Sequence, residues 1–145
     1  MRPLVLKPEE VPAGPVLLDT TAFSHLLRGG AIAQRLAALT ADHELVVSFI
    51  TVGEVMDGAI EAKWGETKLA ALELKLAGCA KAVGSERVAR EYGRIKAHFR
   101  GTKGENDLWI AACSLAEDNP LPIVTTDKDF DQIGVAFGIT IVRPD

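Results

Sequence analysis

The sequence predicts an α/β fold in which helices cover both faces of a mainly parallel β-sheet, a three-layer α/β/α sandwich. Three observations favour this class. Short apolar runs of three to five residues alternate along the chain with longer segments of helical periodicity. Such short, wholly apolar runs are typical of strands in parallel sheets. The length of 145 residues fits one domain.

A proline-rich leader precedes the predicted domain. Prolines at positions 3, 8, 12 and 15 predict an irregular N-terminal arm over residues 1–15, although the apolar run 4–6 could add an edge strand. The α/β domain is expected over residues 16–145. No internal repeat and no low-complexity tract interrupts it.

Within this domain, strands and helices follow from apolar periodicity and from start and stop residues. Thr20 or Thr21 can cap the first helix, Ser85 can cap a strongly basic one, and Asn119-Pro120 ends the last long one. We predict strands at 16–18, 45–49, 123–125 and 139–141, with a weaker candidate at 80–83. We predict helices at 20–27, 31–39, 52–60, 66–77, 85–101 and 108–115, and a short helix or turn at 127–133.

Charge and cysteine usage limit the class of protein. The formal net charge of −4 hides a basic segment, because the stretch from Arg87 to Lys103 holds six basic residues and one acid. A solvated helix face is the ordinary interpretation of such a run, and a phosphate-binding surface is the functional one. Cys79 and Cys113 stand alone, without the spacing of a zinc site or of a disulfide framework. No apolar stretch suits a signal peptide or a membrane span, so we expect a cytoplasmic protein.

Four carboxylates lie where a parallel sheet places its chemistry. Asp19 and Asp127 each directly follow a predicted strand. Glu54 lies in the first turn or so after another strand, and Asp107 lies at the start of a helix. Because ligands of such sheets bind outside the carboxyl ends of the strands, we expect these four side chains to meet in one crevice.

Each of these acids alone has a structural explanation, since Asp is common at helix starts and Glu54 shares its helix face with Asp57 and Glu61. Together, four carboxylates repel one another unless a cation neutralises them. The three histidines are scattered, and an oxygen-only ligand set suits Mg²⁺ or Mn²⁺. Such ions serve phosphodiester hydrolysis, because they activate water and neutralise phosphoryl oxygens. The sequence therefore predicts a metal-dependent nuclease.

Four segments around these acids resemble motifs of the PIN-domain nucleases, most closely the VapC-like toxins of VapBC toxin–antitoxin modules. They are LLDTT (17–21), SFITVGE (48–54), NDLWIAA (106–112) and TTDKDF (125–130). Each is weak alone, but the set is specific in this order and spacing, and it covers nearly the whole chain from Val16 onward. The resemblance implies a three-layer α/β/α fold and Mg²⁺- or Mn²⁺-dependent endonucleolytic cleavage of RNA.

The resemblance also implies roles for single residues. Asp19 and Asp107 match the family's principal metal ligands, Glu54 matches the second acidic position, and Asp127 matches the last. Thr20, Ser48 and Thr126 match positions whose hydroxyls orient carboxylates or water. From the basic segment, we expect four residues to contact RNA phosphates: Arg94, Lys96, Arg100 and Lys103.

The sequence departs from the family pattern in three places. The leader before Val16 is longer than is usual, and Thr21 stands where Asn is frequent. Asp127, Asp129 and Asp131 offer three acids for one family position. We predict that Asp127 fills it, because it lies closest to the strand end, and that Asp129 caps the short helix that follows.

The resemblance to toxins implies a homodimer and a cognate antitoxin that blocks the acidic pocket, often with a basic side chain. Two alternatives stay open: a PIN-like nuclease of RNA processing, and a catalytically silent domain of the same fold that binds RNA or protein. The small size favours the toxin, and the presence of all four acids argues against a silent domain. A phosphoacceptor receiver domain also has acids at strand ends, but the sequence lacks its pairing of an Asp on the middle strand with a lone downstream Lys.

Overall fold

The structure, a computed structural model, describes residues 4–145, so the first three residues of the expected arm, Pro3 among them, lie outside the described part. Its centre is a sheet of six parallel strands in the order β1-β6-β5-β2-β3-β4. The strands are β1 (Leu4–Val5), β2 (Val16–Leu18), β3 (Leu45–Ser48), β4 (Ala80–Ala82), β5 (Ile123–Val124) and β6 (Ile141–Val142). The predicted α/β class and the parallel sheet are confirmed.

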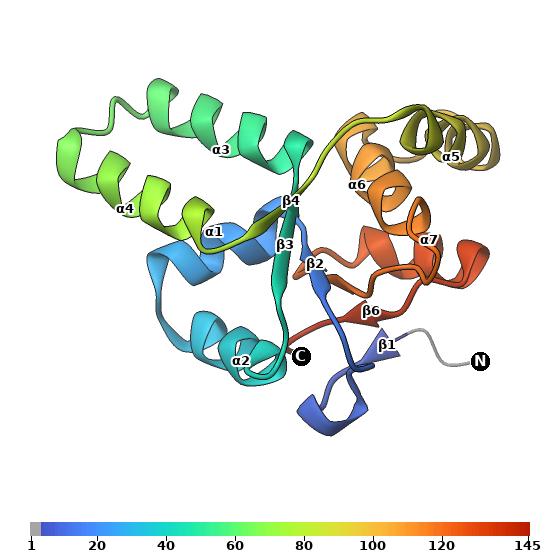
Figure 1. Cartoon of the computed structure of the whole chain (residues 1–145), viewed down its shortest axis with the longest axis horizontal. Coiled ribbons are helices and arrows are strands. Elements are labelled where there is room, and N and C mark those ends of the chain that lie inside the picture. Colours follow the sequence, from blue (N-terminus) through green and yellow to red (C-terminus); the bar gives the residue numbers. More distant parts are fainter. Residues whose placement is uncertain (1–3) are drawn as a thin grey trace.

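Seven α-helices within residues 4–145 cover the two faces of this sheet (Figure 1). One layer consists of α1 (Thr20–Arg28), α2 (Ala31–Thr40), α3 (Phe49–Glu61) and α4 (Glu66–Ala77). The other consists of α5 (Glu86–His98), α6 (Glu105–Leu115) and α7 (Asp129–Phe137). None of the helices in the described residues is long and apolar enough to cross a membrane.

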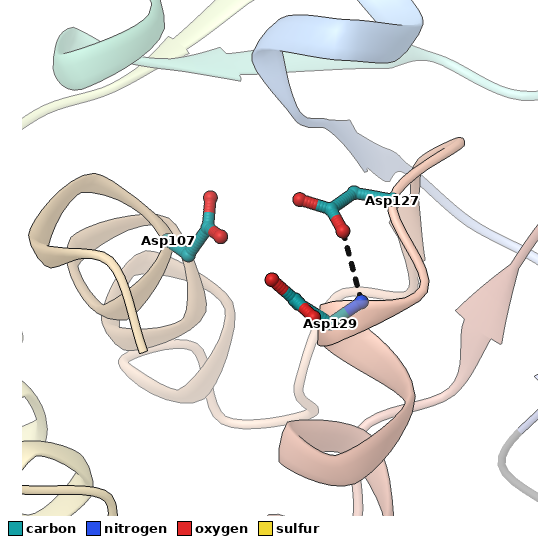
Figure 2. A group of neighbouring side chains, drawn as sticks. All are labelled: Asp107, Asp127 and Asp129. Atoms are coloured by element: carbon teal, nitrogen blue, oxygen red, sulfur yellow. Dashed lines mark hydrogen bonds between the residues drawn. The ribbon is translucent and has the colours of Figure 1, made fainter. Parts of the chain in front are cut away.

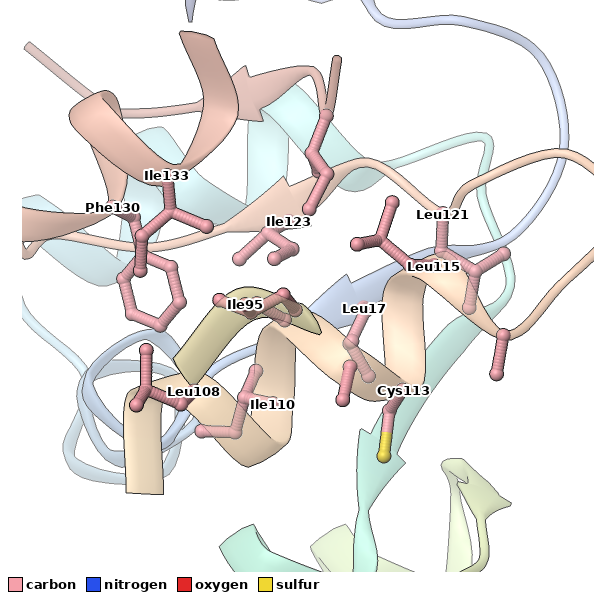
Figure 3. Close-up of a cluster of buried hydrophobic side chains, with 14 of the residues drawn as sticks. Leu17, Ile95, Leu108, Ile110, Cys113, Leu115, Leu121, Ile123, Phe130 and Ile133 are labelled. Atoms are coloured by element: carbon pink, nitrogen blue, oxygen red, sulfur yellow. The ribbon is translucent and has the colours of Figure 1, made fainter. Parts of the chain in front are cut away.

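Neighbouring residues of the central strands point into different hydrophobic cores. Leu17 and Ile123 belong to the core beneath α5, α6 and α7, whereas Leu18 and Val124 belong to the core beneath α1 to α4. Figure 3 shows the first of these cores, in which strand side chains meet those of all three helices. Because side chains alternate along a strand, a strand buried on both faces must be apolar at every position. This explains the unbroken apolar runs in the sequence.

The N-terminal arm is more regular than the sequence predicts. Leu4 lies opposite Ile141 in parallel pairing, and the backbone N–H of Arg143 donates to the carbonyl of Val5 at 3.0 Å. A short 3₁₀ helix, Pro8–Glu10, follows, and Val11 is buried. The candidate edge strand at 4–6 is therefore present, and it extends the sheet on the β6 side.

The first helix is capped by a residue other than the two predicted. The side chain of Asp19, rather than of Thr20 or Thr21, accepts a hydrogen bond from the backbone N–H of Ala22 at 2.9 Å. The cap prediction was wrong because a carboxylate competes for the exposed amides at least as well as a hydroxyl does. Ser85 caps α5 as predicted.

Several other boundaries also differ from the prediction, among them those of α3 and α7. The Ser48 hydroxyl accepts the backbone N–H of Thr51 at 3.2 Å, so α3 begins at once after β3, three residues earlier than predicted. Asp129 does not cap the last helix but is its first residue, and its backbone N–H donates to Asp127 Oδ1 at 2.9 Å. That helix continues to Phe137, beyond the predicted end.

Candidate active site

The carboxyl ends of β2, β3 and β5 lie side by side at one edge of the sheet. Leu18 is level with Val47 of β3 and with Val124 of β5, so the residues that follow these strands emerge together. The backbone N–H of Asp19 donates to the carbonyl of Val124 at 3.0 Å. Ligands of parallel sheets bind at this edge, and the predicted acids lie here.

Asp107, at the start of α6, faces Asp127 and Asp129 across a small gap (Figure 2). One carboxylate oxygen from each of the three lies within 4.8 Å of the others, and Asp129 is the most exposed. The third acid of this stretch, Asp131, points elsewhere and forms an ion pair with Arg143 at 3.1 Å. The structure thus brings both Asp127 and Asp129 to Asp107 and takes Asp131 out of the group.

Asp19 is 2% exposed and is held by donors on several sides. Thr125 Oγ1 donates to its Oδ2 at 2.6 Å, and Thr21 Oγ1 donates to its Oδ1 at 2.8 Å. Burial nevertheless raises the pKa of Asp19 to about 6, because desolvation of the carboxylate outweighs these hydrogen bonds and Asp127 adds repulsion.

Asp107 has a more strongly raised pKa than Asp19. Burial, as the largest cause, and the charges of neighbouring carboxylates together raise its pKa to about 7, the carboxylates acting in the order Asp127, Asp19, Glu54 and Asp129. The other three acids predicted from the sequence therefore all act on Asp107 at this edge. A divalent cation would remove the repulsion, and carboxylate oxygens are the ligands that Mg²⁺ and Mn²⁺ prefer.

Glu54, on α3, links three helices at the rim of the site. Thr20 Oγ1 donates to its Oε1, and Asn106 Nδ2 donates to its Oε2 at 3.0 Å. Thr20 Oγ1 also lies 3.0 Å from Thr51 Oγ1, which is buried between α1 and α3. The Glu54 carboxylate is therefore fixed from two sides, by a hydroxyl of α1 and an amide of α6.

The three predicted hydroxyl positions differ in what they contact. Thr20 bonds to a site carboxylate, as just described. Ser48 caps α3 and lies 3.5 Å from Thr51 Oγ1, so it acts on the site only through other hydroxyls. Thr126 contributes its backbone N–H, which donates to Thr21 Oγ1 at 3.1 Å.

Two residues that contact the acids were not predicted, Thr125 and Asn106, and a third, Thr21, was noted only as a departure from the family's usual Asn. The sequence placed Thr125 inside its strand, but β5 ends at Val124, so Thr125 already stands at the functional edge. Its hydroxyl serves Asp19 and also accepts the backbone N–H of Asp127 at 2.9 Å. Asn106 directly precedes Asp107, and that position was the only signal it gave.

The basic segment is partly occupied by internal contacts. Arg94 pairs with Glu91, and its guanidinium lies 5.7 Å from the ring centroid of Phe137. Lys96 pairs with Glu105 of α6. The remaining two predicted RNA contacts, Arg100 and Lys103, form no ion pair with any residue of the described chain, although Lys103 lies over the Phe99 ring. Of the four residues expected to contact phosphates, Arg100 and Lys103 are therefore the two without an ion pair among residues 4–145.

We expect the metal-free protein to lose stability at this site as the pH rises from about 4 to 8. The folded-state pKa values of about 6 for Asp19 and about 7 for Asp107 exceed the ordinary 3.8, so the folded chain binds more protons than the unfolded chain in this window. The free energy of unfolding then falls with pH until both folded-state pKa values are passed. In chelator, the melting temperature of Asp107→Asn should therefore rise relative to that of the wild type as the pH increases from 5 to 8. An unchanged difference in melting temperature across this window would contradict a raised pKa at Asp107.

Comparison with known proteins identifies the family. The PIN domain model matches residues 16–136. The chain is 32% identical over 123 residues to Ribonuclease VapC1 of Haemophilus influenzae (strain R2866), an alignment that covers 81% of this chain and 90% of that protein. It is 30% identical over 133 residues to Ribonuclease VapC5 of Mycobacterium tuberculosis, covering 88% and 93%.

A solved structure of VapBC-1 from nontypeable Haemophilus influenzae has the same fold. It matches with a TM-score of 0.69 at 27% identity, over 90% of this chain and 96% of that chain. The family model spans the segments that carry all four predicted acids. The chain therefore belongs to the PIN-domain family and, within it, to the VapC ribonucleases, the toxins of VapBC toxin–antitoxin systems.

Proposed function

We propose that this VapC-type ribonuclease hydrolyses RNA internally with Mg²⁺ or Mn²⁺ bound by Asp19, Glu54, Asp107 and Asp127. The observation that carries the proposal is the convergence of acids at this edge: carboxylate oxygens of Asp107, Asp127 and Asp129 lie within 4.8 Å of one another, and burial and neighbouring carboxylates raise the pKa of Asp107. Among residues 4–145, no Lys, Arg or His side chain forms a hydrogen bond or ion pair with any of these acids. In this proposal, the bound metal ion supplies the positive charge that balances the four acids.

The donor set fits a hard divalent ion. It contains carboxylate oxygens and no thiol or imidazole, which favours Mg²⁺ or Mn²⁺ over zinc. When bound, such an ion neutralises phosphoryl oxygens and makes water a better nucleophile. The chain's own part is to hold the ligands in place: Thr21 and Thr125 orient Asp19, and Thr20 and Asn106 orient Glu54. Asp129 is a further candidate ligand.

Cleavage of a defined single-stranded RNA tests the metal mechanism. The purified protein should cut internally in Mg²⁺ or Mn²⁺, be inactive in excess EDTA, and recover when either ion is added back. A 5′-blocked and 3′-blocked RNA excludes cleavage from the ends. Undiminished cutting in EDTA would refute the metal mechanism, and no cutting of any RNA in either ion would refute the proposed activity.

We also propose that the basic segment guides RNA to the acids through Arg100 and Lys103, with smaller contributions from Arg94 and Lys96, which are already paired. Each lost phosphate contact should reduce the slope of log affinity against log salt by roughly 0.7 for single-stranded RNA. The test is an RNA-binding titration at several salt concentrations. The protein carries Asp107→Asn so that the RNA stays intact, and it is compared with the same protein that also carries Arg100→Ala/Lys103→Ala.

The matched control is Arg87→Ala/Arg90→Ala, which removes the same charge from the far end of α5, where both residues pair with acids. It should leave the slope nearly unchanged. An equal slope in both double variants would mean that the segment is only a solvated helix face.

We propose the remaining features from the family. The nuclease domain would comprise residues 16–145 and follow an N-terminal arm, residues 1–15. The protein would form a homodimer and act in the cytoplasm until a cognate antitoxin binds it. The solved relative is a VapBC system, which supports a protein partner. Light scattering of the purified chain, alone and with the product of a neighbouring gene, tests the dimer and the partner.

A further inference from the structure

A hollow of about 300 Å³ lies beside the acid group, between the start of α3 and the start of α6. Its lining residues are Phe49, Ile50, Gly53, Glu54, Asp57 and Asn106. Glu54 belongs both to this hollow and to the acid group, since its charge helps to raise the pKa of Asp107. The hollow borders the acid group in the chain as well, since its lining residue Asn106 directly precedes Asp107 and donates to Glu54.

One wall of the hollow is an exposed aromatic ring that is held in place. Phe49 directly follows β3 and is 37% exposed. Its ring packs edge-on against Trp109, with centroids 6.4 Å apart, and Trp109 is itself stacked on Tyr92 at 3.8 Å. On another side, a Cβ added at Gly84 would lie 3.4 Å from Phe49 Cζ, so the backbone of residue 84 contacts the ring. A flat ligand could stack on Phe49 with little loss of side-chain freedom.

The polar groups of the hollow are hydrogen-bond acceptors. Asn106 is exposed and its Nδ2 is engaged with Glu54, which leaves Asn106 Oδ1 as the group that can accept a hydrogen bond. Asp57 is exposed, and within residues 4–145 its carboxylate has no hydrogen-bond or ion-pair partner. Two carboxylates would repel a phosphate here, whereas a neutral ring that carries N–H donors meets both an aromatic face and acceptors.

We infer that this hollow binds one base of the RNA, next to the scissile phosphate, with Phe49 as its stacking surface and Asp57 reading its edge. The inference rests on the proposed ribonuclease activity and extends it to base preference. Guanine offers an N–H and an amino group side by side, which match the two oxygens of a carboxylate. Uracil offers one N–H between two carbonyl oxygens, which a carboxylate repels. We therefore expect guanine to be favoured and uracil disfavoured.

The test uses a set of RNAs that differ only in the base on either side of one cleavage site. In Mg²⁺ or Mn²⁺, the wild type should show kcat/KM higher for guanine than for uracil at one flanking position, by about tenfold or more. Asp57→Asn should remove most of this preference, because an amide both donates and accepts. Glu61→Gln, which removes a carboxylate from the same helix outside the hollow, should keep it. Phe49→Ala should raise KM for every base, and Phe49→Trp should restore it.

Three outcomes overturn the inference. The first is active enzyme with equal rates for all four bases at both flanks. The second is an Asp57→Asn variant with the same preference as Glu61→Gln. The third is a Phe49→Ala variant whose RNA kinetics are unchanged while its dimer or its binding of a protein partner is lost, which would make the hollow a protein contact. Absence of any cleavage by the wild type would instead refute the proposed activity, so the two failures are distinguishable.

Discussion

Asp107→Asn is expected to lower kcat for RNA cleavage by about a thousandfold or more, because a metal ion supplies several kcal/mol of transition-state stabilisation and each 1.36 kcal/mol is tenfold in rate. The variant removes the carboxylate on which the other acids converge. It keeps the size of the side chain and removes a charge that opposes its neighbours. Single-turnover cleavage of a defined RNA at saturating Mn²⁺ measures the loss.

The control for this variant is Glu117→Gln, which neutralises an exposed acid just beyond the other end of α6. It should cleave RNA at the wild-type rate. Asp107→Asn should also melt no lower than the wild type in chelator at pH 8, because no hydrogen bond or ion pair of the described residues depends on its carboxylate. A large drop in melting temperature together with retained cleavage would make Asp107 a structural residue of the helix start.

Asp127→Asn is expected to slow cleavage by about a hundredfold or more, and Asp129→Asn by about tenfold or less. Of the carboxylates that raise the pKa of Asp107, Asp127 acts most strongly and Asp129 least. Asp129 is also the more exposed of the two and is the first residue of α7. An amide at position 127 can still accept the backbone N–H of Asp129, so the turn should survive the substitution.

Cleavage rates of the two variants over a range of Mn²⁺ concentrations separate weaker metal binding from slower chemistry. If excess Mn²⁺ restores Asp129→Asn but not Asp127→Asn, position 127 is the principal ligand of this pair. Equal losses, or a greater loss in Asp129→Asn, would transfer the last acidic role to Asp129. Asp131→Asn has a different expected effect, on stability, because Asp131 pairs with the buried Arg143.

The order of strands and helices could be predicted because each follows from a local pattern. Leu17 and Leu18 face opposite cores, so the strand had to be apolar at both positions and was visible in the sequence. The extent of α7 was not visible. The predicted element ended at residue 133, but α7 continues through Gly134, where an added Cβ would lie 2.6 Å from Ile141 Cγ1. The glycine is required by the close approach of β6 and of the residues just before it, a contact between two elements that helical periodicity does not show.

The acids of the site were predictable for the same reason, and their partners were not. Asp19 and Asp127 follow strands, and a parallel sheet aligns strand ends whatever the side chains are. One of the two hydroxyls that bind Asp19 comes from Thr125, 106 residues away, and nothing near either residue indicates that pairing. Likewise, Lys96 is one charge in a basic run by sequence, but in the fold it pairs with Glu105 on another helix.

The strand order has a consequence for how the protein is made. β2 is synthesised early, but its neighbour β5 follows only after more than two thirds of the chain, and Leu17 pairs with Ile123. Before β5 is in place, Asp19 lacks Thr125, and Asp107 faces neither Asp127 nor Asp129. Domains fold as units once their sequence has left the ribosome. In an unfinished chain, the acids are therefore present but do not yet lie together. The ribosome, which is itself built largely of RNA, thus completes the chain before the site that would cut RNA has formed.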